Sequence, residues 1–403
     1  MKWEKVRLED CCYSISDGDH QPPPKAQQGI PFVTISNINS MNQLDFSDTM
    51  FVPKEYYQSL DEKRKVRKGD VLYSVVGSFG IPVLIKEERP FVFQRHIAIL
   101  RPKEDIVDSG FLFYTMLNRD FYAKADAVAI GAAQRTVSLG SLRNIKIDVP
   151  SLESQKHIAD ILSAYDDLIE NNQKQIKLLE EAAQRLYKEW FVDLRFPGHE
   201  NTKIVDGVPE GWSYEKLGAL TQTTSGGTPS RRKSEYYVNG SIKWVKTKEL
   251  NDGFIFETEE SITEDAVKNS SAKILPGGTL MVAMYGATIG KIGITASEMA
   301  CNQACCAFIS YDGIISRGYL YCWLMENRNY LISQGKGAAQ PNLSQEVIKN
   351  FSVLCPDKKI MNGFTRIVTA MLENKRVLEN KILMLSKARD DLLPKLMSGE
   401  VEV

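Results

Sequence analysis

The sequence lacks the features that would place this protein in a membrane or in an oxidising compartment. None of its 403 residues belongs to an apolar run long enough to span a bilayer. The first residues, Met1–Asp10, contain no apolar core of a secretory signal. The seven cysteines are odd in number and form no paired framework. We therefore expect a cytoplasmic protein without disulfides and without membrane contact.

The chain also has almost no net charge and contains none of the common catalytic motifs. The formal net charge is −1, so any contact with DNA must be a local basic patch. The sequence contains no Walker-type phosphate loop, no Gly-x-Gly-x-x-Gly after a strand, no His-Glu-x-x-His, no paired Cys-x-x-Cys and no Gly-x-Ser-x-Gly. It also lacks the Asn/Asp-Pro-Pro-Tyr/Phe tetrapeptide of amino-methyltransferases. These absences favour a non-catalytic chain, although a duplicated enzyme with an unrecognised site stays an alternative.

A metal site is not indicated either. Cys301, Cys305 and Cys306 are close in the sequence, but the last two fall in a predicted strand. Buried cysteine in a strand is far more often a small core residue than a metal ligand. We therefore expect no metal in this chain.

What the sequence does contain is a long internal repeat. The segment Gly131–Gln134 reads Gly-Ala-Ala-Gln and returns at Gly337–Gln340, an offset of 206 residues. The same offset then relates Ser138 to Ser344 and continues without a gap into a long apolar-periodic stretch after each proline, Pro150 and Pro356. A duplication of half the chain predicts two similar halves.

Each half begins with a Trp-led segment, at Trp3 and at Trp212, and continues as short strands. Runs of β-branched and aromatic residues between Gly, Pro and Asp turns predict these strands. They are expected at 30–35, 70–76 and 96–100 in the first half, and at 242–245, 279–284 and 304–309 in the second. Helical spacing of apolar residues predicts that the segments 109–126 and 316–334 are helical.

The two long stretches after the prolines carry apolar residues in an alternating four–three spacing. A sustained period of 3.5 residues is typical of a coiled coil, and the other copy is the obvious partner. An ordinary amphipathic helix on a globular core is the alternative. We favour the coiled coil because the strict period occurs twice and in register, and Asn172 on the seam could fix that register. The predicted seam residues are Ile158, Leu162, Ile169, Asn172, Ile176, Leu179, Leu186, Phe364, Val368, Leu378, Ile382, Leu385 and Leu392.

The direction of the helices follows from the segment that connects the halves. Each helix of about 39 residues would be roughly 58 Å long. Antiparallel packing lets the Pro- and Gly-rich residues 191–211 turn directly into the second half. Pro394 should end or kink the second helix. The predicted organisation is a strand-rich domain at 1–150, a long helix at 151–190, a linker at 191–211, a second strand-rich domain at 212–356 and a second long helix at 357–398.

Several loops carry basic or polar side chains that could contact DNA. Basic residues are suited to phosphates, and polar side chains can read base edges. Taken alone, each cluster is also what a solvated loop looks like. The candidate residues are His20, Gln21, Arg64, Lys65, Arg67, Lys68, Arg231, Arg232, Lys233, Lys246 and Lys248.

Taken together, these elements resemble the DNA-specificity subunits of type I restriction–modification systems. The resemblance covers essentially the whole chain and depends on the order of loose motifs, which occur twice. They are Gly-Gly-Thr-Pro-Ser at 226–230, Ile-x-Trp-Val at 242–245, the turn–strand elements near 69–80 and 277–290, the two Gly-Ala-Ala-Gln segments that lead to a proline and a heptad helix, and the ending at 392–399. The first half departs from the commoner opening because it has Asp17–His20 in place of Gly-Gly-Thr-Pro.

The resemblance implies an α+β chain in which two strand-rich target-recognition domains each read one half of a split sequence in double-stranded DNA. It implies that the two long helices form an antiparallel coiled-coil spacer. It also implies that methyltransferase subunits, two per chain, and motor/nuclease subunits are the partners. S-adenosylmethionine, ATP and Mg²⁺ would then belong to those partners. A coiled-coil scaffold that carries two protein-interaction domains is the alternative function.

Overall fold

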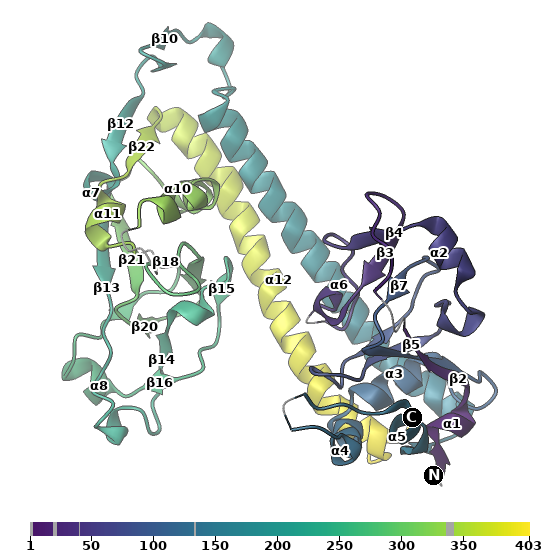
Figure 1. The fold of residues 1–403 in the computed structure, drawn as a ribbon. Coiled ribbons are helices and arrows are strands. Elements are labelled where there is room, and N and C mark those ends of the chain that lie inside the picture. Colours follow the sequence, from purple (N-terminus) through teal and green to yellow (C-terminus); the bar gives the residue numbers. More distant parts are fainter. Residues whose placement is uncertain (1–2, 19–21, 40, 133, 336–341) are drawn as a thin grey trace. The chain divides into compact units, whose positions relative to one another are not determined.

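The structure is a computed structural model that describes residues 3–18, 22–39, 41–132, 134–335 and 342–403. It divides into two compact units (Figure 1). The first unit contains Met1–Leu168 and Leu385–Val403, and the second contains Ile169–Met384. Each unit therefore includes one part of each long helix, α6 (Leu152–Tyr187) and α12 (Lys358–Ser398).

The first unit contains two sheets and a short strand pair. The antiparallel sheet β2-β8-β5-β6 consists of β2 (Cys12–Asp17), β8 (Ile97–Pro102), β5 (Val71–Ser74) and β6 (Pro82–Leu84). The mixed sheet β4-β3-β7 consists of β4 (Met50–Val52), β3 (Ile30–Val33) and β7 (Val92–Phe93), with β3 parallel to β7. The pair consists of β1 (Glu4–Arg7) and β9 (Lys146–Val149). Its shorter helices are α1 (Leu8–Cys11), α2 (Lys54–Ser59), α3 (Ser109–Leu117), α4 (Arg119–Val128) and α5 (Leu139–Asn144).

The second unit repeats this plan. Its larger sheet, β13-β21-β18-β19-β15, consists of β13 (Thr221–Ser225), β21 (Cys305–Tyr311), β18 (Leu280–Ala283), β19 (Ile292–Thr295) and β15 (Phe254–Ile255). Its mixed sheet, β16-β14-β20-β17, consists of β16 (Ser261–Ile262), β14 (Ile242–Val245), β20 (Met299–Cys301) and β17 (Ile274–Leu275). The pair is β12 (Ser213–Lys216) with β22 (Ser352–Cys355). Its helices are α7 (Leu217–Leu220), α8 (Glu264–Lys268), α9 (Arg317–Glu326), α10 (Arg328–Ser333) and α11 (Gln345–Lys349).

The expected α+β fold with an internal duplication is confirmed. The order β2-β8-β5-β6 matches β13-β21-β18-β19, and the parallel pair β3–β7 matches β14–β20. The strands lie within a few residues of their predicted positions, and β14 has the predicted bounds. The second unit adds β15 and β17 at the sheet edges.

The two predicted shorter helices are each broken into two. Asn118 separates α3 from α4, and Asn327 separates α9 from α10. In both halves the break comes at an asparagine, a residue whose side chain competes with helical hydrogen bonding and favours helix ends. The prediction that 109–126 and 316–334 are helical is therefore confirmed, apart from the asparagine break in each segment and residues at the ends of the second.

The long helices contribute to the core of each unit. In the first unit, Ile158 and Leu162 of α6 share a buried cluster with Leu393, Leu396 and Met397 of α12 and with the larger sheet. In the second unit, Ala183 and Tyr187 of α6 share a cluster with Phe364, Val368 and Leu372 of α12, again with the larger sheet. Apolar burial of this extent is the main source of stability for both helix segments.

Within each unit the two helices pack antiparallel, as predicted. In the first unit Asp166 pairs with Arg389, whereas the earlier residue Leu162 clusters with the later residue Leu396. In the second unit Glu180 pairs with Lys375, whereas the ring of the later residue Tyr187 lies 6.2 Å from that of Phe364.

Pro394 does not end α12, which continues to Ser398. A proline inside a helix costs one backbone hydrogen bond. Leu396 and Met397, which follow it, are buried in the core of the first unit, and this burial offsets the loss. Of the two outcomes predicted at Pro394, an end of the helix does not occur, and a kink stays a prediction.

The connection after α6 is packed rather than extended. A π-helical turn, Lys188–Val192, continues the helix, and a small hairpin of β10 (Ile204–Val205) and β11 (Val208–Pro209) follows. Phe196 is buried, and its ring lies 4.6 Å from that of Trp212 in the core of the second unit. The predicted division into five segments stays an interpretation of the sequence.

Candidate nucleic-acid interface

Three of the predicted DNA contacts in the second unit, Arg231, Lys246 and Lys248, lie beside the strands β14 and β16. Trp244 in this strand is buried, and its Nε1 donates a hydrogen bond to the carbonyl oxygen of Gly227 at 3.1 Å. The backbone at the preceding residue, Gly226, lies very close to the backbone of Cys301, since a Cβ on Gly226 would be 1.7 Å from the Cys301 carbonyl oxygen. The Gly-Gly-Thr-Pro-Ser turn is therefore held against β14 and β20, and the residues that follow it begin from a fixed position.

Arg231 follows directly after this turn and lies over two aromatic rings. Its guanidinium carbon is 4.3 Å from the centre of the Tyr237 ring and 5.3 Å from that of Trp244. Such cation–π contacts restrict an arginine without neutralising it. More than half of the Arg231 side chain remains exposed. A pre-oriented, exposed guanidinium is suited to contact a phosphate or a base edge.

An acidic segment that the sequence analysis missed lies against these basic residues. Because β16 pairs antiparallel with β14, Glu259 and Glu260 come beside Lys246. Lys246 Nζ is 2.8 Å from Glu259 Oε2 and 2.6 Å from Glu260 Oε1. Arg231 donates to Glu260 Oε2 at 2.6 Å, and Lys248 pairs with Glu259. We call Glu257–Glu260 the acidic segment.

Glu260, the last residue of the acidic segment, remains ionised over a wide pH range. Hydrogen bonds from Arg231 and Lys246 lower the pKa of Glu260 to about 2. At the start of the segment, Glu257 accepts a bond from Lys243 at 3.1 Å. The basic surface of the second unit is therefore largely neutralised by its own carboxylates. A signal for this was present in the sequence, because Glu257, Glu259 and Glu260 form an acidic run close to a basic run.

The basic cluster of the first unit is organised in the same way but on a smaller scale. Lys65 Nζ donates to Glu62 Oε1 at 2.7 Å, and Arg67 donates to Glu62 Oε2 at 3.1 Å. Arg64 is half-buried in the short 3₁₀ turn that begins at Glu62. Lys68 is exposed, and within the described part of the chain no ion-pair partner lies next to it.

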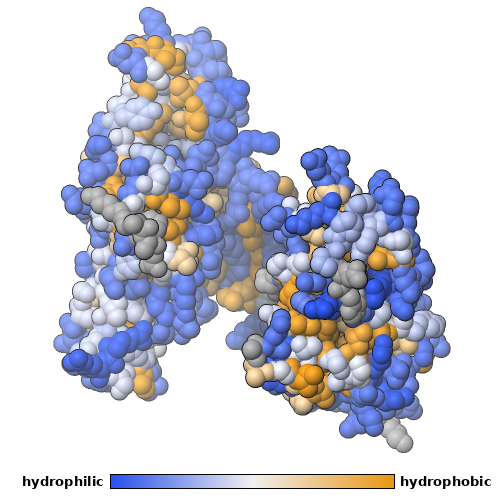
Figure 2. Space-filling view, viewed as in Figure 1, coloured by the Kyte–Doolittle hydropathy of each residue, from blue (hydrophilic) through white to orange (hydrophobic). Residues whose placement is uncertain are grey.

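The remaining predicted DNA contacts are not drawn together. His20 and Gln21 lie outside the described residues. Lys233 is exposed and donates to the hydroxyl of Tyr236 at 2.9 Å. Arg232 is exposed without an ion pair among the residues that the structure describes. On the face shown in Figure 2, hydrophilic residues predominate around α8 and β16, the end of the second unit that carries this cluster.

The predicted helix seam is shielded from solvent in both units. In the first unit Ile158 and Leu162 are buried and Leu385 and Leu392 are half-buried. The seam positions of the second unit are also buried or half-buried, and they are Ile169, Asn172, Ile176, Leu179, Leu186, Phe364, Val368, Leu378 and Ile382. Lys375 occupies a position in the same spacing and is 1 % exposed, which the sequence analysis did not anticipate.

The described residues contain neither a metal site nor a membrane-spanning helix. No group of His, Cys, Asp and Glu there has the arrangement of a metal site. All seven cysteines are buried and free. No described helix combines the length and the apolar character that crossing a bilayer requires.

The comparison with known proteins agrees with this geometry. The model of the family described as type I restriction modification DNA specificity domain matches residues 1–181 and 209–383. The chain belongs to this family. A type I restriction enzyme specificity subunit of Methanocaldococcus jannaschii, MjaIX, is 28% identical over 83% of this chain and 78% of its own length. The HindI specificity subunit of Haemophilus influenzae is 26% identical over 99% of each chain.

A solved structure supports the fold. The S subunit of a type I restriction–modification system from M. genitalium superimposes with a TM-score of 0.65 over 98% of this chain and 96% of that one, at 15% identity. The family match falls in two segments, which agrees with the duplicated topology of the two units.

Proposed function

We propose that this chain, a DNA-specificity subunit of a type I restriction–modification system, reads the two halves of a split DNA target with two different surfaces. The observation that carries this proposal is the duplicated topology combined with unlike loops. The same strand order occurs in both units, but the turn after β14 carries Lys246 and Lys248 where the turn after β3 carries Thr34 and Ser36. Two similar scaffolds with different exposed side chains suit two different half-sites.

In this proposal, affinity and sequence selectivity come from different residues. Exposed cations such as Arg231, Lys248 and Lys68 contact phosphates and supply most of the affinity. A few polar side chains on the loops contact base edges and supply the sequence. The helix pair sets the distance between the half-sites, so the bases between them are spanned without being read. Successive accessible faces of the major groove are about 34 Å apart, which is less than the length of either helix.

The chemistry would belong to other subunits. The chain itself is non-catalytic in this proposal and directs two methyltransferase subunits and the motor/nuclease subunits to the DNA in the cytoplasm. S-adenosylmethionine, ATP and Mg²⁺ are bound by those partners. The names of the relatives, which are specificity subunits of type I restriction enzymes, support this assignment.

The test is a comparison of DNA methylation in the host with and without this gene. Deletion should abolish methylation of one split, asymmetric motif and leave other motifs unchanged. An unchanged methylome, with the operon shown to be expressed, would overturn the proposal. A scaffold that carries protein-interaction domains is distinguished by DNA binding across a salt series, since a DNA reader loses affinity steeply as the salt concentration rises.

A further inference from the structure

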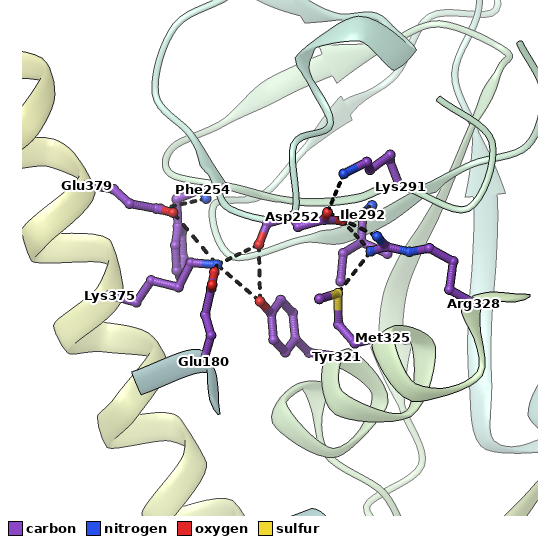
Figure 3. Close-up of polar contacts among 10 residues, drawn as sticks. All are labelled: Glu180, Asp252, Phe254, Lys291, Ile292, Tyr321, Met325, Arg328, Lys375 and Glu379. Carbon is purple, nitrogen blue, oxygen red and sulfur yellow. Dashed lines mark hydrogen bonds and ion pairs between the residues drawn. The ribbon is translucent and has the colours of Figure 1, made fainter. Parts of the chain in front are cut away.

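One buried ammonium joins four elements of the second unit. Lys375 of α12 donates to Glu180 Oε1 of α6 at 2.5 Å, to the carbonyl oxygen of Asp252 at 2.5 Å and to the hydroxyl of Tyr321 of α9 at 3.0 Å (Figure 3). The side chain is 2 % exposed. A buried charge is costly unless it is paired and hydrogen-bonded, and here all three ammonium protons have acceptors.

The backbone that Lys375 contacts belongs to a tight turn before β15. Asp252 has a positive φ of 66° in this turn. Although burial opposes ionisation, hydrogen bonds from Lys291 and Arg328 hold the pKa of Asp252 below its ordinary value. Arg328 lies 2.5 Å and Lys291 2.8 Å from the carboxylate (Figure 3). The side chain of Asp252 therefore fixes the turn to the strand-rich domain, while its carbonyl group faces the helices.

A second helix residue holds the same turn. Glu379, one helical turn after Lys375, accepts a hydrogen bond from the backbone N–H of Phe254 at 2.8 Å. A Cβ on Gly253 would lie only 2.3 Å from Glu379 Oε1, so a larger residue at this position would displace the Glu379 carboxylate. Lys375 and Glu379 of α12 therefore hold the turn of the strand-rich domain by hydrogen bonds to the backbone of Asp252 and Phe254.

Pairing of the helices does not by itself require a lysine here. The residue at the same place in the first copy, at the offset of 206, is Ile169, which is also buried at its seam position. An apolar side chain is the ordinary occupant of a coiled-coil seam. The reason for an ammonium group at position 375 is therefore its contact with the turn at Asp252, which lies outside the helix seam.

We propose that Lys375 is a positioning residue that locks the second strand-rich domain onto the helix pair, so that its DNA-reading surface keeps a fixed direction relative to the helices. This inference rests on the proposed function. A fixed direction limits which gap between the two half-sites the protein accepts. Without the lock, the domain still reads its own half-site, but the protein tolerates gaps that are one base pair longer or shorter.

The test uses the complex of this chain with its methyltransferase subunits, and DNA duplexes that carry both half-sites at the natural gap or at a gap altered by one base pair. The variant Lys375→Met keeps the length of the side chain and removes the charge, and Lys387→Met changes an exposed lysine of the same helix. We expect the wild type and Lys387→Met to prefer the natural gap, and Lys375→Met to lose at least fivefold of that preference. Its affinity for a duplex with the second half-site alone should stay within twofold of the wild type.

Two results would overturn the inference. One is an unchanged gap preference in Lys375→Met, and the other is a loss of half-site affinity equal to the loss at the natural gap, which a merely structural role would produce. If Lys375→Met does not fold, Tyr321→Phe replaces it, because this change removes one acceptor and retains the charge. It should give a smaller loss of gap preference in the same direction, and no loss would again overturn the inference. A wild type without sequence-specific binding would instead refute the proposed function.

Discussion

The acidic segment of the second unit should weaken binding to DNA of unrelated sequence. Glu259 and Glu260 pair with Arg231, Lys246 and Lys248, so a phosphate must compete with carboxylates that are already in place. The double change Glu259→Gln and Glu260→Gln removes this competition and keeps the shape of both side chains. We therefore expect the double variant to bind nonspecific DNA more tightly than the wild type.

The size of the effect follows from the four ion pairs that the change abolishes. An exposed ion pair stabilises the free protein by about 0.5 kcal/mol. Four pairs that DNA no longer has to break therefore make the free energy of DNA binding more favourable by about 2 kcal/mol, or roughly 30-fold in affinity. The salt dependence should also change. Each additional phosphate contact steepens the plot of log affinity against log salt by about 0.9, so two removed charges predict a slope steeper by about 1.8.

The assay is fluorescence anisotropy with a labelled duplex of unrelated sequence, titrated at several salt concentrations. Glu264→Gln is the matched control, because it removes the same charge from an exposed pair with Lys268 in the same unit. Unchanged or weaker binding by the double variant would refute the reasoning, since it would mean that the carboxylates hold the cations in a binding arrangement. Acidification should not imitate the variant: the depressed pKa of Glu260, about 2, keeps this carboxylate charged until the pH falls far below 5.

Three further predictions concern the helices, a close approach of the backbone and the cysteines. Inserting a few residues within 166–180 should change the gap in the methylated motif and leave both half-sites intact, which methylation sequencing would show; an unchanged gap would refute the role of the helix as a ruler. Gly226→Ala should lower the free energy of unfolding by about 3 kcal/mol, because its Cβ would overlap the Cys301 carbonyl. Gly286→Ala should lower it by only about 1 kcal/mol, because its Cβ meets no neighbour within 4 Å but the residue has a positive φ of 85°. Chemical denaturation measures both values. Burial raises the pKa of Cys306 and Cys322 to about 12, so a thiol reagent at pH 8 should modify the native protein slowly and all seven cysteines after denaturation; rapid modification of the native protein would contradict the buried arrangement.

Local patterns predicted the scaffold well because its elements depend on local sequence. The period of the helix seam and the run Ile242–Val245 are set by neighbouring residues, and both occur as predicted. The break at Asn118 was missed because apolar periodicity continues across it. Whether the helix ends at Pro394 depends on the tertiary fold, because the burial of residues after the proline outweighs its local cost.

The candidate site was predictable only in part, since its charges are paired through sheet register. The basic residues and the nearby acidic run could be named from the sequence, but the pairing between them could not. Glu260 meets Lys246 because β16 pairs with β14, with Ile242 opposite Ile262. The partner of Lys375 is equally non-local, because its ammonium contacts Asp252, 123 residues away. Interactions of this kind follow from topology, which a pattern of residue types does not specify.

The two units differ in the contacts of one corresponding turn, which follows β3 in the first unit and β14 in the second. After β3, Asn37 ties the turn to the segment before β4 through its amide, which donates to the carbonyl oxygens of Asp45 and Asp48. After β14, the matching turn is tied to the segment before β16 by the ion pairs of Lys246 and Lys248. The hydrogen bonds of the first turn are neutral, so DNA would not have to displace a charged partner there. In the second turn, DNA phosphates would have to replace the carboxylates that are paired with the lysines. The two similar scaffolds therefore carry one neutral and one charged turn at this position, and under the proposed function the two turns would meet their half-sites by different physical means.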